Sequence, residues 1–134
     1  MTVDWRGEGI MRIVRQAAME AVYDGALSVE GEATRLIESG PKTGRVYQRN
    51  SVSHQASAPG EPPASDTGRL KQSSTVETDT ADLSATVTWR TLYAAMLEFG
   101  TTRMLPRPFA RVALANKRAA INDDIKNSIR EALL

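Results

Sequence analysis

The sequence predicts an α+β fold in a single domain spanning residues 1–134. Three observations lead to this class. Apolar residues recur at three- and four-residue steps near both ends of the chain, they alternate with polar residues over part of the middle, and a segment rich in proline, glycine and serine follows the first pattern. Two helices packed on a small antiparallel sheet of about three to four strands satisfy all three.

The first helix is expected from Gly9 to about Glu38, after an N-terminal tail of residues 1–8. Gly25 and Gly31 interrupt its pattern, and each costs about 1 kcal/mol relative to alanine in a helix interior, so a kink or break is expected there. Alanine dominates the first half of the apolar stripe, which lets a partner approach closely. The stripe comprises Ile10, Ile13, Val14, Ala17, Ala18, Ala21, Val22, Val29, Ala33, Leu36 and Ile37.

Residues 39–66 differ sharply in composition from the helix before them. Four prolines and many serines leave too few apolar residues to offset the entropy lost on ordering, so a long flexible loop is expected. Its first half holds Lys42, Arg45 and Arg49 with no acidic residue. We interpret it as a mobile basic arm, the alternative being a tolerated solvated insertion. The only histidine, His54, lies in this loop and is expected to be solvated.

The apolar period then changes to two, which predicts an antiparallel hairpin with one buried face. Asp79 to Asp82 supply the turn between its strands. Residues 93–99 fit either a strand or two turns of helix, and both alternatives stay open. The inward face of the first strand comprises Leu70, Ser74 and Val76, and that of the second Leu83, Ala85, Val87 and Trp89; Phe99 is also expected to face the core.

A second helix is expected to start at Pro108 and to run to about Leu133. Gly100 ends the preceding element, and a positive φ there would exclude a β-branched residue. Pro106 and Pro108 fix the connection, and proline suits the first position of a helix. The apolar face of this helix comprises Leu114, Ile121, Ile125, Ile129 and Leu133.

Charge and composition exclude several classes of function. The formal net charge is only +1, but residues 1–40 carry −3, 41–75 carry +3, 76–100 carry −3 and 101–134 carry +4. Alternating blocks favour contacts between unlike patches over one broad basic face for nucleic acid. With no cysteine and one histidine, we expect no disulfide, no metal site and no cofactor. No segment has the roughly 18 consecutive apolar residues of a membrane span, so a protein in solution in a reducing cytoplasm is expected.

The sequence contains no recognisable catalytic motif. Asp123 and Asp124 are adjacent, so on a helix they diverge by about 100° instead of converging. The glycines Gly7 and Gly9 follow no strand and lack the third glycine of a phosphate-binding loop. Ser73 and Ser74 belong to no recognisable nucleophile motif. We therefore expect no enzymatic activity.

An ordered set of short motifs carries a family resemblance. Asp66-Thr67-Gly68-Arg69-Leu70 precedes a serine-rich strand, and Tyr93-Ala94, Leu97-Glu98-Phe99-Gly100-Thr101 and Arg107-Pro108-Phe109 follow it. This order, which covers nearly the whole chain, resembles the small neck and tail-completion proteins of long-tailed bacteriophages, also described as minor tail components. Val112, Met96 and Leu97 depart from the residues common in that family, all by apolar exchanges.

The resemblance implies a structural virion protein without catalytic activity. Such proteins take part in head–tail joining: they form a ring, expected to be sixfold, where the head connector meets the tail tube, and leave a channel for DNA. The implied partners are further copies of the chain, tail-tube or terminator proteins, connector proteins and passing DNA, without a membrane. The implied location is the virion neck, with assembly in the host cytoplasm.

The alternative function is a sequence-independent nucleic-acid-binding module that uses the arm and the C-terminal helix.

The residues expected to act in assembly fall into two groups. Expected contacts with subunits or partners are Lys42, Arg45, Arg49, Arg69, Arg103, Arg107 and Phe109, and expected structural positions are Thr67, Gly68, Tyr93, Glu98, Phe99, Gly100, Pro106 and Pro108.

Overall fold

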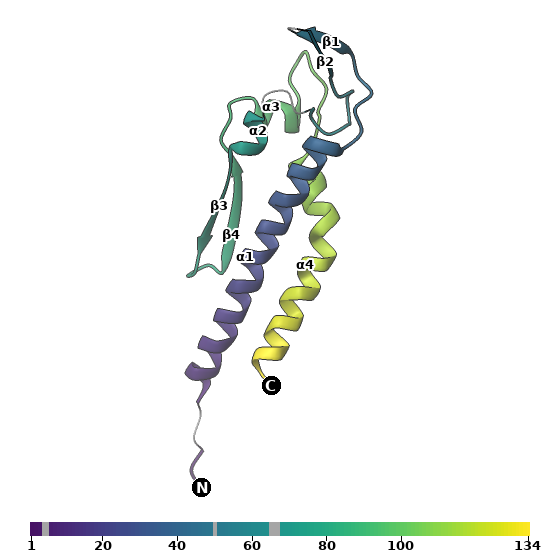
Figure 1. Ribbon diagram of the computed structural model, residues 1–134. Coiled ribbons are helices and arrows are strands. Elements are labelled where there is room, and N and C mark those ends of the chain that lie inside the picture. The colour runs from purple at the N-terminus through teal and green to yellow at the C-terminus, as the bar shows by residue number, and fades with distance from the viewer. Residues whose placement is uncertain (4–5, 50, 65–67) are drawn as a thin grey trace.

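The computed structural model describes residues 1–3, 6–49, 51–64 and 68–134. Helices α1 (Gly7–Ser39) and α4 (Ala110–Ala132) pack side by side and form an elongated rod (Figure 1). One hairpin lies along the rod, and the other short elements gather at the end opposite the two termini (Figure 1). The α+β class, with a long helix at each end of the chain, is confirmed. None of the helices in the described ranges is long and apolar enough to cross a membrane.

Helix α1 is continuous over 33 residues, about 50 Å at 1.5 Å per residue. The expectation of a kink or break at Gly25 and Gly31 is therefore wrong. A Cβ added to Gly25 would lie 3.0 Å from Cγ2 of Ile121, so this glycine allows α4 to approach closely. Gly31 faces open space. Packing against α4 stabilises the helix enough to outweigh both glycines.

The hydrophobic core lies where the C-terminal part of α1 meets the short elements. Helix α1 contributes Val29, Ala33, Leu36 and Ile37, while Leu70, Ala94, Phe109 and Ala113 close over them from later segments. Among the residues that the structure describes, Phe109 and Ile37 are the large side chains with less than 2% exposure. The core is thus small and lies at one end, with alanines setting a short distance between the two helices.

A polar contact joins the two helices beside this core. The Glu32 carboxylate accepts bonds from Arg35 Nε (3.0 Å) and Nη2 (2.6 Å) and from Asn116 Nδ2 (3.1 Å) of α4. The hydrogen bond from Arg35, then that from Asn116, lower the pKa of Glu32 to about 2 against the opposing effect of burial. Glu32 therefore stays ionised and fixes the register of α1 against α4.

Segment 39–66 contains regular structure that its composition did not predict. Strands β1 (Val46–Arg49) and β2 (Val52–Gln55) pair antiparallel, with Tyr47 opposite His54. His54 is half-buried in β2, so its expected place in a solvated loop is wrong. Flanking bonds between Gly44 N–H and Ala56 O and between Ala56 N–H and Arg45 O, both 2.9 Å, extend the hairpin toward the rod.

The predicted second hairpin forms, from β3 (Ser74–Asp79) and β4 (Ser84–Trp89). Strand β4 follows the predicted alternation from Ala85 to Trp89, whereas β3 is half-buried over residues 74–76 and exposed over residues 77–79, so the alternation predicted for it is wrong. Leu83, expected in the second strand, lies in the turn before it with φ 51°. The Asp79 carboxylate accepts bonds from Ala81 and Asp82 N–H, which confirms the predicted turn. Leu70 does not belong to a strand: it is buried in a short helix, α2 (Arg69–Gln72), which starts after Gly68 at φ 78°. The four strands form two separate two-stranded sheets instead of one.

The segment between β4 and α4 contains a helix and not a strand. Residues 94–99 form α3 (Ala94–Phe99), preceded by Tyr93, which settles the alternative left open for 93–99. Helix α4 begins at Ala110, two residues after Pro108, so the expectation that Pro108 opens the helix is wrong. The start is fixed by Glu98, which lies 12 residues before Ala110 in the sequence.

Candidate assembly interface

Glu98 caps α4 from outside the helix. Its carboxylate is buried and accepts the backbone N–H groups of Phe109 (2.8 Å), Ala110 (3.0 Å) and Arg111 (2.9 Å). Arg111 Nε adds a charged bond at 3.0 Å, and its Nη2 reaches the Glu98 carbonyl at 2.8 Å. A carboxylate at a helix N-terminus satisfies unpaired donors and complements the helix dipole. Glu98 therefore joins α3 rigidly to the rod.

Gly100 makes the turn between α3 and α4 possible. Its φ of 77° lies where side chains are rarely tolerated, so the condition that excludes a β-branched residue is met, and an added Cβ would lie 2.8 Å from Met104 O. Thr101 N–H donates to Met104 O at 2.8 Å and closes the following turn. The Pro106 carbonyl then accepts Gly60 N–H at 2.9 Å, which ties this loop to segment 39–66. These bonds hold residues 92–109, which we call the corner, in a rigid turn between β4 and α4.

This corner presents apolar side chains to solvent. Leu92, Met96, Phe99 and Leu105, which we call the α3 patch, are each more than half exposed, with Leu92 at 92%. Phe99 is thus not a core residue, contrary to its alternation; its ring instead lies beneath the Arg111 guanidinium, 5.6 Å from the centroid. Met96 and Phe99 lie three residues apart on α3, so their side chains are neighbours, and neighbouring exposed apolar side chains favour an interaction site.

Phe109 lies in the core and not in an interface, contrary to the expectation. It is 1% exposed, and its ring meets Trp89 edge to face at 5.0 Å between centroids. The aromatic roles of Phe99 and Phe109 are therefore the reverse of those the sequence predicted. Glu98, whose neighbouring residue Phe99 points outward, faces inward to reach the Phe109 backbone.

Two of the basic residues expected in the arm, Lys42 and Arg45, make different contacts. Lys42 is half-buried and donates to Leu36 O (3.0 Å) at the end of α1, and burial lowers the pKa of its amine. This contact serves the helix C-terminus, where a cation is favourable. Arg45 stacks over the exposed Tyr47 ring at 5.3 Å on the hairpin. The backbone of Arg49 lies in β1.

The other expected contact residues lie around the corner. Arg103 is exposed on the loop, where its backbone N–H donates to Thr101 Oγ1 at 3.2 Å. Arg69 is exposed at the start of α2. Arg107 is half-buried, with Nη1 3.3 Å from Met104 Sδ. Thr67 lies outside the described residues.

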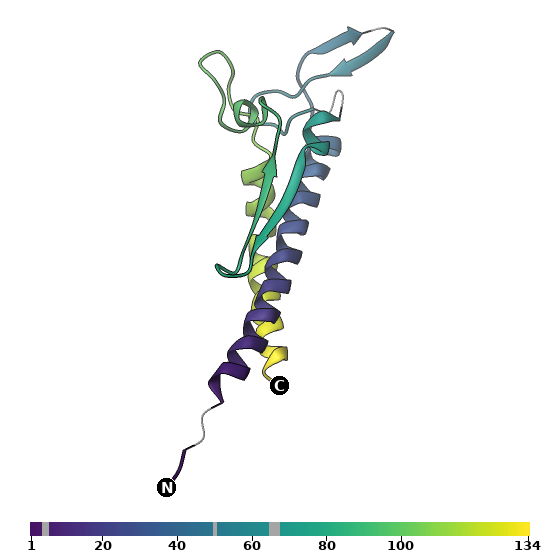
Figure 2. The same cartoon turned by 90° about the vertical axis from the view of Figure 1, so that its left-hand side faces the viewer.

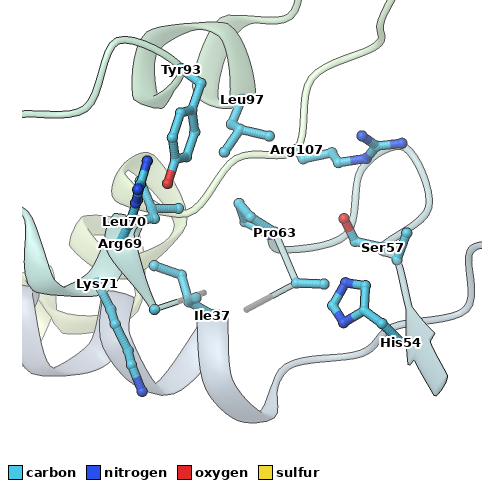
Figure 3. Close-up of a pocket in the computed structure, with 13 residues that line it drawn as sticks. Ile37, His54, Ser57, Pro63, Arg69, Leu70, Lys71, Tyr93, Leu97 and Arg107 are labelled. Atoms are coloured by element: carbon cyan, nitrogen blue, oxygen red, sulfur yellow. The ribbon is translucent and has the colours of Figure 1, made fainter. Parts of the chain in front are cut away.

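A cavity of about 380 Å³ separates the corner from segment 39–66. Tyr93, Leu97 and Arg107 line it from the corner, and His54 and Ser57 from the opposite side (Figure 3). Arg107 Nε is buried with no hydrogen-bond partner among the described residues. Within the same residues, no three His, Cys, Asp or Glu side chains converge to hold a metal ion.

Glu61 organises the base of segment 39–66, a role that the sequence analysis missed. Its carboxylate accepts Thr43 Oγ1 and, at 2.8 and 2.9 Å, the N–H groups of Thr43 and Ala58. The side-chain bond from Thr43 and the two backbone bonds lower the pKa of Glu61. Glu61 is the only glutamate in residues 39–66. Its position among the prolines is the one feature of the sequence that could have indicated that a carboxylate binds the backbone here.

Comparison with family models, with characterised proteins and with solved structures found no match to this chain.

Proposed function

We propose that this chain is a structural protein of a long-tailed bacteriophage that forms a ring at the head–tail junction. The ring, sixfold in this proposal, joins the connector to the tail tube and leaves a channel for DNA; it assembles in the host cytoplasm and stays in the virion neck. The ordered motifs from Gly68 to Phe109 support the proposal. Most of them form one corner, held by Glu98 and Gly100, that displays the α3 patch.

The observation that carries the assembly part is the area of exposed surface. A compact monomer of 14.6 kDa has an accessible surface of about 6,900 Å², whereas this chain exposes 9390 Å². The excess, about 2,500 Å², exceeds the roughly 800 Å² that one partner contributes to a standard interface. A subunit with a neighbour on each side would use two such faces, so the excess is of the size a ring requires.

Exposed apolar side chains occur toward both ends of the rod. The α3 patch occupies one end, and Ile10, Met11 and Ile13 on α1 lie about half exposed toward the other. Different patches at opposite ends favour heterologous, head-to-tail contacts, which close into rings when the rotation permits. The alternating charge blocks of the sequence favour the same kind of contact.

Electron microscopy of the purified chain, alone and mixed with tail tubes and connector complexes, tests this function. We expect rings, seen alone or only at the end of a tube. A Leu92→Ser/Phe99→Ser variant should keep the fold and lose attachment, because both side chains are exposed. A matched Tyr23→Ser/Leu27→Ser variant, which removes two exposed apolar side chains from the middle of α1, should attach normally. A folded chain that binds neither tubes nor connectors at any concentration would refute the function.

A second candidate, non-specific binding to nucleic acid, is supported by the β1–β2 hairpin. Arg45 stacks on an exposed tyrosine there, and hairpin and rod meet only through its base (Figure 2). Neutralising several phosphates should make log Kd depend steeply on log salt. Absence of binding to duplex DNA at low salt would eliminate this candidate, and binding that Arg45→Ala leaves unchanged would remove the hairpin from it.

A further inference from the structure

A groove of about 460 Å³ runs along the rod beside the β3–β4 hairpin. Its floor is α1, and its two walls are β4 and α4; in Figure 2 the hairpin crosses α1 with β4 on the side of α4. The lining is chiefly aliphatic. It includes Val22 and Val29 of α1, Ala85, Val87 and Trp89 of β4, and Leu114, Ile121 and Ile125 of α4.

The wall formed by β4 is an open sheet edge. Arg90 N–H donates to Ser73 O at 3.2 Å, on the β3 side. Because N–H directions alternate along an antiparallel strand, those of Thr88 and Thr86 also face β3. The N–H groups of Trp89, Val87 and Ala85 therefore point away from β3, toward the groove. Such an edge is a template for another strand.

The groove also contains an unused donor. Trp89 Nε1 is buried and has no hydrogen-bond partner among the described residues. A buried N–H without an acceptor costs on the order of 1–3 kcal/mol. The open edge itself offers accessible backbone groups, and an incoming strand brings the carbonyls that pair with its N–H groups.

We propose that the groove receives the β3 edge of a second copy of this chain. The segment from Glu77 to Asp82 carries three acidic residues and no basic one. The opposite wall, α4, carries five basic and three acidic residues, and Arg118 falls on its groove side, between Leu114 and Ile121. Hairpin β1–β2 is basic and does not match this wall, so charge selects β3.

Pairing of β4 with a neighbour's β3 repeats from subunit to subunit. Each copy offers one β4 edge and one β3 edge, which are different surfaces, so the contact is heterologous and generates a ring when it closes. Closure also removes both open edges of the two-stranded sheet. The inference rests on the self-association in the proposed function, and adds the strand edges along the rod to the apolar side chains at its ends as a contact surface.

Hydrogen exchange followed from low to high protein concentration tests the edge directly. The N–H groups of Ala85, Val87 and Trp89 should exchange freely in the dilute chain and become protected, by at least about tenfold, as association proceeds. Those of Thr86 and Thr88 should be protected throughout, because they bond within the hairpin. Association without new protection at the three edge amides would overturn the inference and leave the ring itself standing.

Proline substitution separates the two sides of β4. Ala85→Pro removes an N–H from the open edge and none from the hairpin ladder, so it should keep the helical signal and weaken self-association at least about tenfold. Thr86→Pro is the matched control and should disrupt the hairpin itself. A folded Ala85→Pro chain that associates like the parent would contradict strand pairing.

Cysteine cross-linking covers the case in which the proline variant does not fold. The chain has no cysteine, so Thr86→Cys and Thr75→Cys can be made as separate proteins of different size and mixed. Edge pairing predicts mixed disulfides far in excess of either homodimer, whereas a symmetric contact predicts the reverse.

Arg118→Glu should weaken association about five- to tenfold at low salt, and Lys126→Glu should not. If the edge is protected but no tube or connector is bound, the inference survives and the proposed function fails.

Discussion

Replacing Glu98 tests whether one side chain sets both the start of α4 and the geometry of the corner. The carboxylate receives three backbone N–H bonds of 2.8–3.0 Å from Phe109, Ala110 and Arg111, and its side chain is 7% exposed. Glu98→Ala removes all three acceptors. The Phe109 N–H is then left without an acceptor, and water can reach the N–H groups of the less buried Ala110 and Arg111.

The expected loss follows from these contacts. Removing an N-terminal cap costs about 0.5–2 kcal/mol, and the lost attraction between carboxylate and helix dipole adds about 1 kcal/mol in a partly buried setting. These contributions sum to about 1.5–3 kcal/mol, and because the Phe109 N–H stays buried and unpaired we expect Glu98→Ala to lower the free energy of unfolding by the upper value, about 3 kcal/mol. Glu98→Gln keeps one carbonyl acceptor but turns an NH₂ group toward a donor, so its loss should be about 1.5–2 kcal/mol.

Urea unfolding followed by circular dichroism, at concentrations low enough to exclude association, measures these values. For a chain of this size, 3 kcal/mol corresponds to roughly 10 °C in Tm. Glu131→Ala, an exposed glutamate of α4, is the control and should change stability by no more than about 0.5 kcal/mol. An alanine variant within 0.5 kcal/mol of the parent, or equal losses for alanine and glutamine, would show that the cap does not act as described.

The remaining predictions concern the turn, the helix contact and the hairpin. Gly100→Val should cost at least about 2 kcal/mol by urea unfolding, because φ is positive and the added Cβ lies 2.8 Å from a carbonyl oxygen, whereas Gly31→Ala, facing open space, should stabilise by up to about 1 kcal/mol. The pKa of Glu32, about 2, lies below its usual value, so its stabilising effect is complete above pH 4.5 and is lost as the pH falls toward 2. Glu32→Gln should remove that pH dependence and about 1–2 kcal/mol, a value reduced because its partner Arg35 is solvent-exposed and screened. Replacing residues 46–55 by Asn-Gly should leave Tm nearly unchanged, since Arg45 and Ala56 are already bonded, and should abolish any binding to DNA that depends on the hairpin; an unfolded product would show that the hairpin is structural.

The sequence predicted those elements whose periodicity is repeated over many residues. Helices α1 and α4 and the β3–β4 hairpin each show a sustained pattern, and all three form. Predictions failed where one residue's local preference met a tertiary contact. Gly25 should have interrupted α1, but it lies against Ile121 and allows the two helices to pack closely. Packing energy outweighs about 1 kcal/mol of propensity.

The two phenylalanines of the corner show why the site was harder to predict than the fold. Alternation assigned Phe99 to the core, because residues 93–99 fit a strand as well as a helix. In the helix that forms, Ala94 and Glu98 face inward, four residues apart, and Phe99 faces solvent. Phe109 then enters the core beside Trp89. Sequence alone could not choose, because the deciding bonds join Glu98 to backbone groups 11 to 13 residues later.

The cap and the turn explain how a chain with so small a core can hold a rigid assembly surface. Two side chains of the α3 patch, Met96 and Phe99, lie on a helix of six residues, which is too short to be stable alone, and Leu92 and Leu105 flank that helix. Glu98 anchors that helix to α4, Leu97 O accepts Arg107 N–H at 2.6 Å, and Pro106 O accepts the N–H of Gly60. The patch is therefore ordered before any partner binds, and association does not have to bear the entropy of ordering it. Loss of the Glu98 cap should for this reason weaken assembly even under conditions where α1 and α4 remain folded.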